Sequence, residues 1–148
     1  MTLDLTADLY EACQQISPRH PDYATLSIED GFDWSSLSCC RFERLYLVAF
    51  RSVWQPEADL GLLREHDDRA FEEALASGGL LRYFKGNANE QGECLSFCLW
   101  ETREQAMKAA DAASHRTAAG ISAHMYSSYI LDRYWLKKAE ENLVFEQI

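Results

Sequence analysis

Hydrophobic positions follow two alternating periods along the C-terminal two thirds of the chain. The stretch RLYLVAFRSVW, residues 44–54, is rich in β-branched and aromatic residues and is followed by the breaker QPEAD, which predicts a strand. Residues 59–79 then carry apolar side chains at helical spacing. Asp59 is a candidate N-cap, and Gly78 and Gly79 are typical of a helix end, so this segment predicts a helix.

The segments that follow complete a recognisable order. LLRYFKG (80–86) and CLSFCLW (94–100) predict two strands joined as a hairpin by the polar turn NANEQGE. Thr102 and Gln105 form a capping box that predicts a second helix, and Ser114 is a candidate cap for a further helical stretch, residues 115–126. SYILDRYWLKK (128–138) predicts the fourth strand. The order β-α-β-β-α-β indicates an α+β, ferredoxin-like fold with an antiparallel sheet.

At 148 residues the chain is expected to form one domain with additions at both ends. Residues 44–138 are the expected ferredoxin-like domain, residues 1–43 an N-terminal extension packed on it, and residues 139–148 a C-terminal tail. Within the extension, TADLYEACQQI predicts a short helix, whereas SPRHPDY and IEDGFDWSSLS indicate loops that wrap the domain.

Composition narrows the function classes. The formal net charge of −10, from 24 acidic and 14 basic residues, disfavours binding to nucleic acid or anionic lipid, since such binding depends on cationic side chains. No apolar run is long enough to cross a bilayer, so no membrane association is expected. The start MTLDLTADLY has the pattern of neither a basic nor an apolar signal region, and a cytoplasmic location is expected.

The five cysteines predict reduced thiols, because their number is odd and no C-x-x-C motif occurs. Cys94 and Cys98 are four residues apart on a predicted strand, hence about 13 Å apart at roughly 3.3 Å per residue. A disulfide needs Cα atoms within about 7 Å, so the two cannot bond each other or share a metal ion. Both faces of this strand are largely apolar, which predicts a homodimer that buries the sheet face away from the helices.

Three stretches carry a family resemblance: residues 46–86, residues 94–106 and HRTAAGISAHMYSSYILDRYWLKK, residues 115–138. They are similar to an uncharacterised, mainly fungal protein family of the dimeric α/β-barrel superfamily, which includes antibiotic-biosynthesis monooxygenases and haem-degrading monooxygenases. The resemblance implies a ferredoxin-like protomer whose sheet packs on that of its mate. It implies no particular reaction, because this fold supports many functions.

The haem-degrading branch uses an Asn on its first strand, a Trp and a His on its second helix. His115 is in a position to match that His. LYLVAFRSVW has no Asn, however, and REQAMKAADAA has no Trp, since Trp100 lies on the preceding strand. The expectation is therefore that the protein uses no cofactor, with haem as the alternative.

His115 is the leading single candidate for chemistry. In helical register it shares a face with small and polar residues that leave room for a ligand between helix and sheet: Ala118, Ala119, Ser122, and Met125 or Tyr126. An imidazole there is suited to acid–base catalysis or to ligating haem iron. The alternative is structural, with the alanines allowing close packing and His115 bonding a backbone group.

Two arginines lie in the middle of predicted strands that are neighbours in this topology. A partly buried Arg51 or Arg133 needs an acid or an anionic ligand. Arg133 with Tyr129 and Trp135 on one strand face is arranged to line a pocket for an acidic or phenolic aromatic compound, and an intersubunit ion pair is the alternative. The expected catalytic residues are thus His115, Tyr129 and Arg133, and the expected ligand-binding residues are Arg51, Trp100, Ala119, Ser122 and Tyr126.

Three functions remain open. The first is a small-molecule enzyme, a cofactor-independent monooxygenase or an isomerase/cyclase, acting on a small aromatic or anionic compound in a helix–sheet pocket. The second is a haem-binding protein with His115 as axial ligand. The third is a non-catalytic dimeric binding or assembly protein. The acidic run REHDDRAFEE has the pattern of a solvated helix face, and no metal site is expected.

Overall fold

A five-stranded antiparallel sheet forms the centre of the protein. The computed structural model describes residues 5–55, 60–110, 126–140 and 142–148. The strands of the sheet are β3 (Arg44–Trp54), β4 (Leu80–Phe84), β5 (Glu93–Trp100), β6 (Tyr126–Ala139) and β7 (Asn142–Gln147). They lie in the order β4-β5-β3-β6-β7, and every neighbouring pair is antiparallel.

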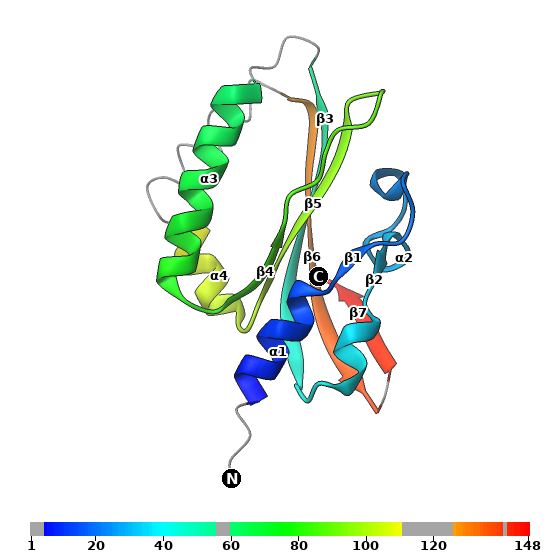
Figure 1. Ribbon diagram of the computed structural model, residues 1–148, viewed down its shortest axis with the longest axis vertical. Coiled ribbons are helices and arrows are strands. Elements are labelled where there is room, and N and C mark those ends of the chain that lie inside the picture. Colours follow the sequence, from blue (N-terminus) through cyan, green and yellow to red (C-terminus); the bar gives the residue numbers. More distant parts are fainter. Residues whose placement is uncertain (1–4, 56–59, 111–125, 141) are drawn as a thin grey trace.

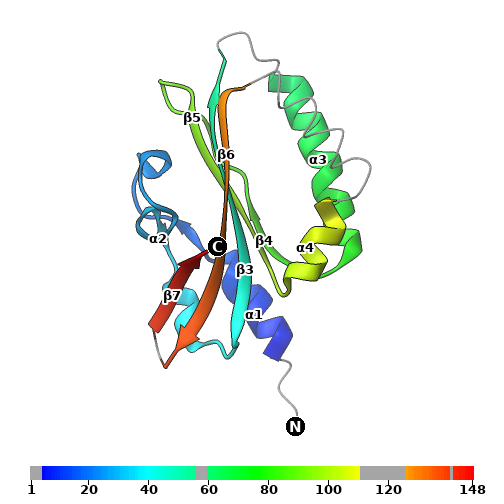
Figure 2. The ribbon, with the colours of Figure 1, turned by 180° about the vertical axis from the view of Figure 1, so that it is seen from behind.

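The predicted ferredoxin-like fold is confirmed. The four strands β3 to β6 are those expected from the sequence. Within this four-stranded unit the first strand, β3, is central and the fourth, β6, lies at the edge. The helices α3 (Leu60–Ser77) and α4 (Arg103–Ala110) connect them and lie together on one side of the sheet (Figure 1). The same arrangement seen from behind shows β7 beside β6 (Figure 2). The residues expected to form a tail thus add a fifth strand, which pairs with β6 from Tyr134↔Gln147 to Ala139↔Asn142.

Local signals at the helix ends act largely as predicted. The helix α3 ends at Ser77, and Gly78 and Gly79 follow with φ of 86° and 85°, a conformation that residues with a Cβ rarely adopt. At the start of α4, the Thr102 hydroxyl oxygen accepts from the backbone N–H of Gln105 at 3.2 Å. The Gln105 side chain bonds that same hydroxyl rather than the Thr102 backbone N–H, so only half of the capping box forms. Asp59, Ser114 and the helical stretch predicted over 115–126 fall outside the described residues, apart from Tyr126, which begins β6.

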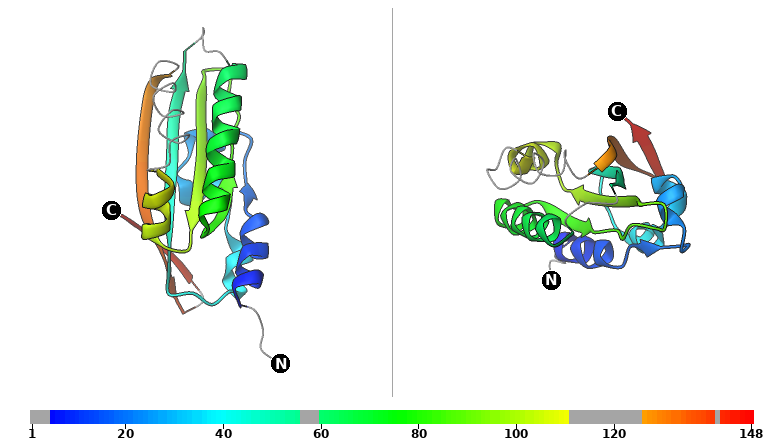
Figure 3. Two further views of the ribbon diagram at one scale, coloured as in Figure 1. Left: turned by 90° about the vertical axis from the view of Figure 1, so that its left-hand side faces the viewer. Right: turned by 90° about the horizontal axis from the view of Figure 1, so that it is seen from above.

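The N-terminal segment, residues 5–40, covers the side of the sheet that faces away from α3 and α4 (Figure 3). It contains α1 (Leu5–Gln14), β1 (Ser17–Pro18), the 3₁₀ turn η1 (Tyr23–Thr25), α2 (Ile28–Gly31), β2 (Phe32–Asp33) and the 3₁₀ turn η2 (Ser35–Cys39). The predicted helix corresponds to α1, and the predicted loops contain short helical turns and a two-strand pairing of β1 with β2. The segment is therefore built of compact elements wherever its apolar residues meet the sheet.

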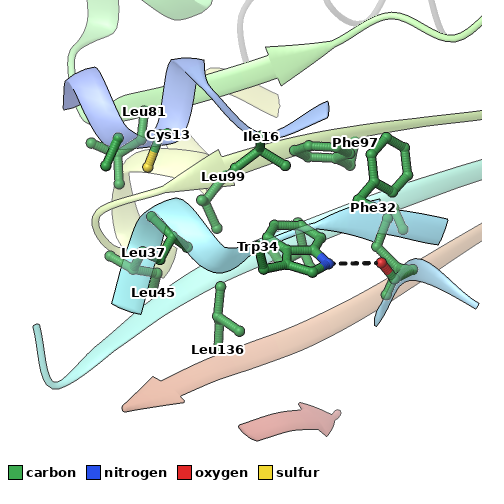
Figure 4. Packing of buried hydrophobic residues seen from close by; sticks show 14 of the residues in the cluster. Cys13, Ile16, Phe32, Trp34, Leu37, Leu45, Leu81, Phe97, Leu99 and Leu136 are labelled. Atoms are coloured by element: carbon green, nitrogen blue, oxygen red, sulfur yellow. Dashed lines mark hydrogen bonds between the residues drawn. The ribbon is translucent and has the colours of Figure 1, made fainter. Parts of the chain in front are cut away.

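This covering buries the larger hydrophobic core (Figure 4). Phe97 of β5 is fully buried, and its ring lies 5.0 Å from the Phe32 ring and 5.4 Å from the Trp34 ring, measured between centroids. The Trp34 indole N–H donates to the Ile28 carbonyl at 3.1 Å, which satisfies the one polar group this side chain brings into the core. Leu47, Leu95 and Leu99 are also fully buried on this face.

The expectation that a second subunit covers this face is therefore corrected. The sequence showed that both faces of the sheet are apolar, and this part of the prediction is confirmed. The apolar residues of the second face are, however, buried against residues 9–37 of the same chain. Apolar patterning reports that a surface is covered and does not distinguish an intramolecular cover from a subunit.

Cationic side chains of the sheet fasten this cover through its backbone carbonyls. Arg51 of β3 donates to the carbonyls of Ala24 and Leu26. Lys138 of β6 donates to the carbonyls of Leu37 and Ser38, at 2.7 and 2.8 Å. On β4, Arg82 donates to the carbonyl of Ile16 at 3.3 Å. Each of these contacts joins a strand to a turn of the N-terminal segment.

Candidate functional site

Tyr46 lies on the buried, helix-facing side of the sheet, near the start of β3. It lies opposite Trp100 on β5 and opposite Trp135 on β6, so three large rings lie side by side across neighbouring strands. The Tyr46 and Trp135 rings are 5.4 Å apart between centroids and meet edge to face. The helices pack on this row with small side chains: Ala74 of α3, and Ala106 and Ala109 of α4.

Two buried polar groups on the helix-facing side of the sheet lack a hydrogen-bond partner among the described residues, the hydroxyl of Tyr46 and the indole N–H of Trp54. Only 1% of Tyr46 is exposed, and its hydroxyl oxygen has no hydrogen-bond partner within the described part of the chain. Buried polar groups are nearly always hydrogen-bonded, and leaving one unpaired costs about 1–3 kcal/mol. A phenol so placed can donate to, or accept from, a polar group of a bound molecule.

The thiol of Cys98, on the neighbouring strand, accepts a hydrogen bond and has a raised pKa. The Trp100 indole N–H donates to the Cys98 sulfur at 3.1 Å, and burial raises the pKa of the Cys98 thiol to about 12. A thiol with such a pKa stays protonated at neutral pH and is therefore a poor nucleophile. As predicted, Cys94 and Cys98 are not joined to each other, and the Cys94 thiol instead donates to the Gly86 carbonyl at 3.4 Å. Among the described residues no three side chains of the kinds that bind metals come together.

A second aromatic group occupies the other end of the same sheet face. We call it the aromatic end group, and it consists of Phe50 and Trp54 of β3 with Tyr126 and Tyr129 of β6. The Tyr126 and Tyr129 rings stack at 5.4 Å between centroids, and Trp54 and Phe50 lie 6.4 and 6.5 Å from Tyr126 and Tyr129, respectively. Tyr129 is 49% exposed. Exposure therefore rises along the helix-facing side of the sheet, from the buried Tyr46 towards Tyr129.

The structure decides which strand face meets the helices, a point that the sequence left open. Tyr129, Arg133 and Trp135 point to the helix side with Tyr46, whereas Ile130 and Tyr134 point to the side of the N-terminal segment. Trp100 and Tyr126 are also on the helix side. Of the predicted site residues, the structure thus places four on one face of the sheet: Tyr129, Arg133, Trp100 and Tyr126.

Arg51 does not belong with these residues. Its side chain lies on the opposite face, where Ala24 and Leu26 accept its hydrogen bonds. The acid or anion expected for this half-buried cation is replaced by two backbone carbonyls. Arg133 does face the helices, but it is exposed, so it does not provide a buried positive charge.

His115, Ala119 and Ser122 lie outside the described residues, so their roles remain predictions. Haem binding, which would depend on His115 as the axial ligand, likewise stays a prediction. Tyr46, by contrast, was missed by sequence reasoning, because in RLYLVAFRSVW it is one aromatic residue among several with strand propensity. The only signal in the sequence was its alternation with Leu45 and Leu47, which places it on the other face from them.

The sequence matches the PB2B2.08-like protein family over residues 2–147. The chain belongs to this family. It is similar to the UPF0643 protein PB2B2.08 of Schizosaccharomyces pombe, with 34% identity over 101 residues, which cover 64% of this chain and 46% of that protein. The matched region thus spans about half the length of that relative. The family resemblance read from the sequence is confirmed.

Solved structures share the fold of this PB2B2.08-like protein. A provisionally named antibiotic biosynthesis monooxygenase from Nitrosomonas europaea superposes with a TM-score of 0.54 and 12% identity, over 66% of this chain and 93% of that one. SnoaB, a cofactor-independent oxygenase from Streptomyces nogalater, superposes with a TM-score of 0.52 and 8% identity, over 66% and 97%. Rv0793 from Mycobacterium tuberculosis superposes with a TM-score of 0.53 and 16% identity, over 60% of this chain and 91% of that one. At these identities the likeness establishes the fold.

None of the described helices combines the length and the apolar composition that crossing a membrane requires.

Proposed function

We propose that this PB2B2.08-like protein binds a small aromatic molecule in the layer between the sheet and its helices, with the Tyr46 hydroxyl as the polar contact. The observation that carries the proposal is that this hydroxyl is buried and has no partner among the described residues. Natural ligand sites are mostly apolar and aromatic, with a few polar groups that fix the orientation of the ligand. The row of Trp100, Tyr46 and Trp135 has this composition.

The chemistry of this layer favours an uncharged ring system. Apart from the Tyr46 hydroxyl, Ser52, at 8% exposure, is the buried polar or charged residue among those described, and Arg133 on the same face is exposed. A buried anionic group would therefore lack a counter-charge, which is energetically costly. An aromatic compound with a hydroxyl or carbonyl oxygen would satisfy Tyr46 without that cost.

A monooxygenase-like or isomerase/cyclase reaction is the catalytic form of this proposal. It is supported by the shared fold with SnoaB, a cofactor-independent oxygenase. In such a reaction Tyr46 would donate a hydrogen bond to an oxygen of the substrate and stabilise negative charge that develops on it. The acid–base group would be His115, as expected from the sequence, with Tyr129 lining the approach.

A pair of ligands that differ by one hydroxyl tests the Tyr46 contact. We expect 2-naphthol to quench or enhance the intrinsic tryptophan fluorescence, because Trp100 and Trp135 flank Tyr46, and naphthalene to bind more weakly. Tyr46→Phe should weaken 2-naphthol binding about tenfold, the equivalent of one hydrogen bond to a buried phenol, and leave naphthalene binding unchanged.

Tyr134→Phe is the control, because it removes the hydroxyl of a half-buried tyrosine that lies on the other face of the sheet. It should leave both affinities unchanged. Equal binding of 2-naphthol by the wild type and by Tyr46→Phe, or no binding of either compound up to its solubility limit, would refute the proposed site.

A further inference from the structure

A second buried donor lies at the other end of the sheet face that carries Tyr46, where β3 finishes and β6 begins (Figure 1). The indole N–H of Trp54 is buried and has no hydrogen-bond partner within the described part of the chain. The residue as a whole is partly exposed, so this buried N–H lies close to the surface. Buried polar groups are nearly always hydrogen-bonded, and this one lacks the partner that such a group normally has.

The indole N–H groups of two other tryptophans are paired inside the protein. Trp34 donates to the Ile28 carbonyl at 3.1 Å, and Trp100 donates to the Cys98 sulfur at 3.1 Å. Of the tryptophans in the described part of the chain, Trp54 is the one whose N–H is both buried and unpaired. Its donor is therefore available to an acceptor that the chain itself does not supply.

The backbone of Trp54 is held from both neighbouring strands, which fixes where the ring is attached. Its backbone N–H donates to the carbonyl of Gly92, just before β5, at 2.8 Å. Gly92 has φ of 80°, and a Cβ there would lie 3.0 Å from the Trp54 carbonyl oxygen, so glycine permits this close approach. On the β6 side, the Ser127 hydroxyl donates to the Val53 carbonyl at 3.1 Å. A donor on so fixed a backbone is pre-organised for a ligand.

The surroundings of this N–H define the class of ligand. An indole N–H donates and cannot accept, so its partner must supply an acceptor atom. The Tyr126 ring lies 6.4 Å from the Trp54 ring and stacks on the Tyr129 ring, which favours a planar aromatic partner. The described strand positions that share this end of the face are uncharged: Ser52, Cys94, Tyr126 and Tyr129. A carboxylate would find no cation among them, so a neutral carbonyl oxygen is the favoured acceptor.

We propose that the aromatic end group binds a neutral aryl ketone, whose carbonyl oxygen accepts a hydrogen bond from the indole N–H of Trp54. This site is separate from the one around Tyr46. The two residues are eight positions apart on β3, hence about 26 Å between Cα atoms at roughly 3.3 Å per residue. A two-ring compound does not span that distance, so the inference does not depend on what binds at Tyr46.

The indole N–H signals of the full-length protein, labelled with ¹⁵N-tryptophan, test the contact directly. The four tryptophans give four signals, and Trp54→Phe identifies the signal of Trp54. We expect 1-tetralone to shift this signal downfield in a saturable way, because a hydrogen bond forms at that N–H. Tetralin, which has the same rings without the oxygen, should cause no downfield shift. The Trp34 signal should stay in place, since its N–H is already bonded on the other side of the sheet.

Equilibrium dialysis measures the same contact as a ratio of affinities. The wild type should bind 1-tetralone about tenfold more tightly than tetralin, the equivalent of one hydrogen bond. In Trp54→Phe the ratio should fall to about one, because the ring stays aromatic and the donor is lost. Tyr10→Phe is the control, since Tyr10 is 45% exposed on α1, and it should keep the ratio of the wild type.

Three results would overturn the proposal. The first is a Trp54 signal that does not move up to the solubility limit of 1-tetralone. The second is a shift confined to Trp100 and Trp135, which would place the ketone beside Tyr46. The third is an unchanged ratio of affinities in Trp54→Phe. Failure of the 2-naphthol experiment together with a shifted Trp54 signal would refute the Tyr46 site alone and leave this one supported.

Discussion

The guanidinium of Arg51 donates to the carbonyl of Leu26, a residue 25 positions earlier in the chain and just beyond the turn η1. The last carbonyls of a helical turn lack partners within the turn and carry partial negative charge. Lys138 donates to the carbonyls of Leu37 and Ser38 in η2, of which Leu37 also accepts from the backbone N–H of Cys40. Arg82 donates to the carbonyl of Ile16, just beyond α1. A half-buried cation on a strand can therefore be an anchor for the backbone and needs no anionic ligand.

Loss of this anchor should loosen one part of the N-terminal segment. Arg51→Met keeps most of the apolar stem of the side chain but removes both hydrogen bonds, and we expect the free energy of unfolding to fall by about 1.5–3 kcal/mol. Urea unfolding measures this loss, and amide exchange should speed up around Ala24 and Leu26. Arg69→Met is the control, because Arg69 pairs with Glu65 in solvent and should cost at most about 0.5 kcal/mol. Equal effects of the two variants would contradict the anchoring role.

The core beneath the N-terminal segment should be sensitive to truncation. Phe97 is fully buried between Phe32, Trp34 and Phe84. Phe97→Ala should lower the free energy of unfolding by about 3–5 kcal/mol, since it removes a large ring and leaves a cavity. Met107→Ala, at a side chain that is 50% exposed on α4, should cost less than about 1 kcal/mol. A small effect of Phe97→Ala in chemical denaturation would mean that the segment does not pack against β5.

Two buried thiols, Cys13 and Cys98, should make the free energy of unfolding fall as the pH rises above about 9. Burial raises the pKa of Cys13 and of Cys98 from an ordinary 9.0 to about 12. The folded state keeps both protons longer than the unfolded state, so this contribution is complete below pH 9 and is lost as pH rises from about 9 to about 12. The slope should reach about 1.4 kcal/mol per pH unit for each thiol.

Urea unfolding between pH 8 and 10.5 measures this slope. Cys13→Ala should make it shallower, whereas Cys39→Ala should leave it unchanged because Cys39 is exposed. An identical slope in the wild type and Cys13→Ala would argue against a perturbed thiol at position 13.

The strands and helices of the sheet domain could be predicted because their signals are local. Alternation in RLYLVAFRSVW and the capping residue Thr102 specify β3 and the start of α4 within a few residues of chain. The strand β7 was missed because NLVFEQ is short and follows β6 directly, through a turn in which Glu140 has φ of 57°. A non-glycine residue in that conformation gives no clear mark in the sequence.

The packing of the N-terminal segment on the sheet and the candidate site around Tyr46 could not be predicted, because they depend on contacts between residues far apart in the sequence. Ile16, Ile28, Trp34 and Leu37 have no regular period, because Ile16 follows α1, Ile28 begins α2, and Trp34 and Leu37 belong to the cap and body of η2. Tyr46 became a candidate only when its burial and its unpaired hydroxyl were known together. Arg51 was misread because its partners are carbonyls, and the sequence does not show where a carbonyl will point.

The contact between Lys138 and η2 also bears on how the chain is made. Its bonds to Leu37 and Ser38 join residues 101 and 100 positions apart. The N-terminal segment is synthesised about 100 residues before Lys138, which fastens η2 to β6. Ile28, Phe32 and Leu37 therefore remain exposed to water, or in transient contacts, until β6 has been synthesised. Contacts so distant in sequence slow folding, so residues 5–40 are exposed to aggregation and chaperone capture during translation.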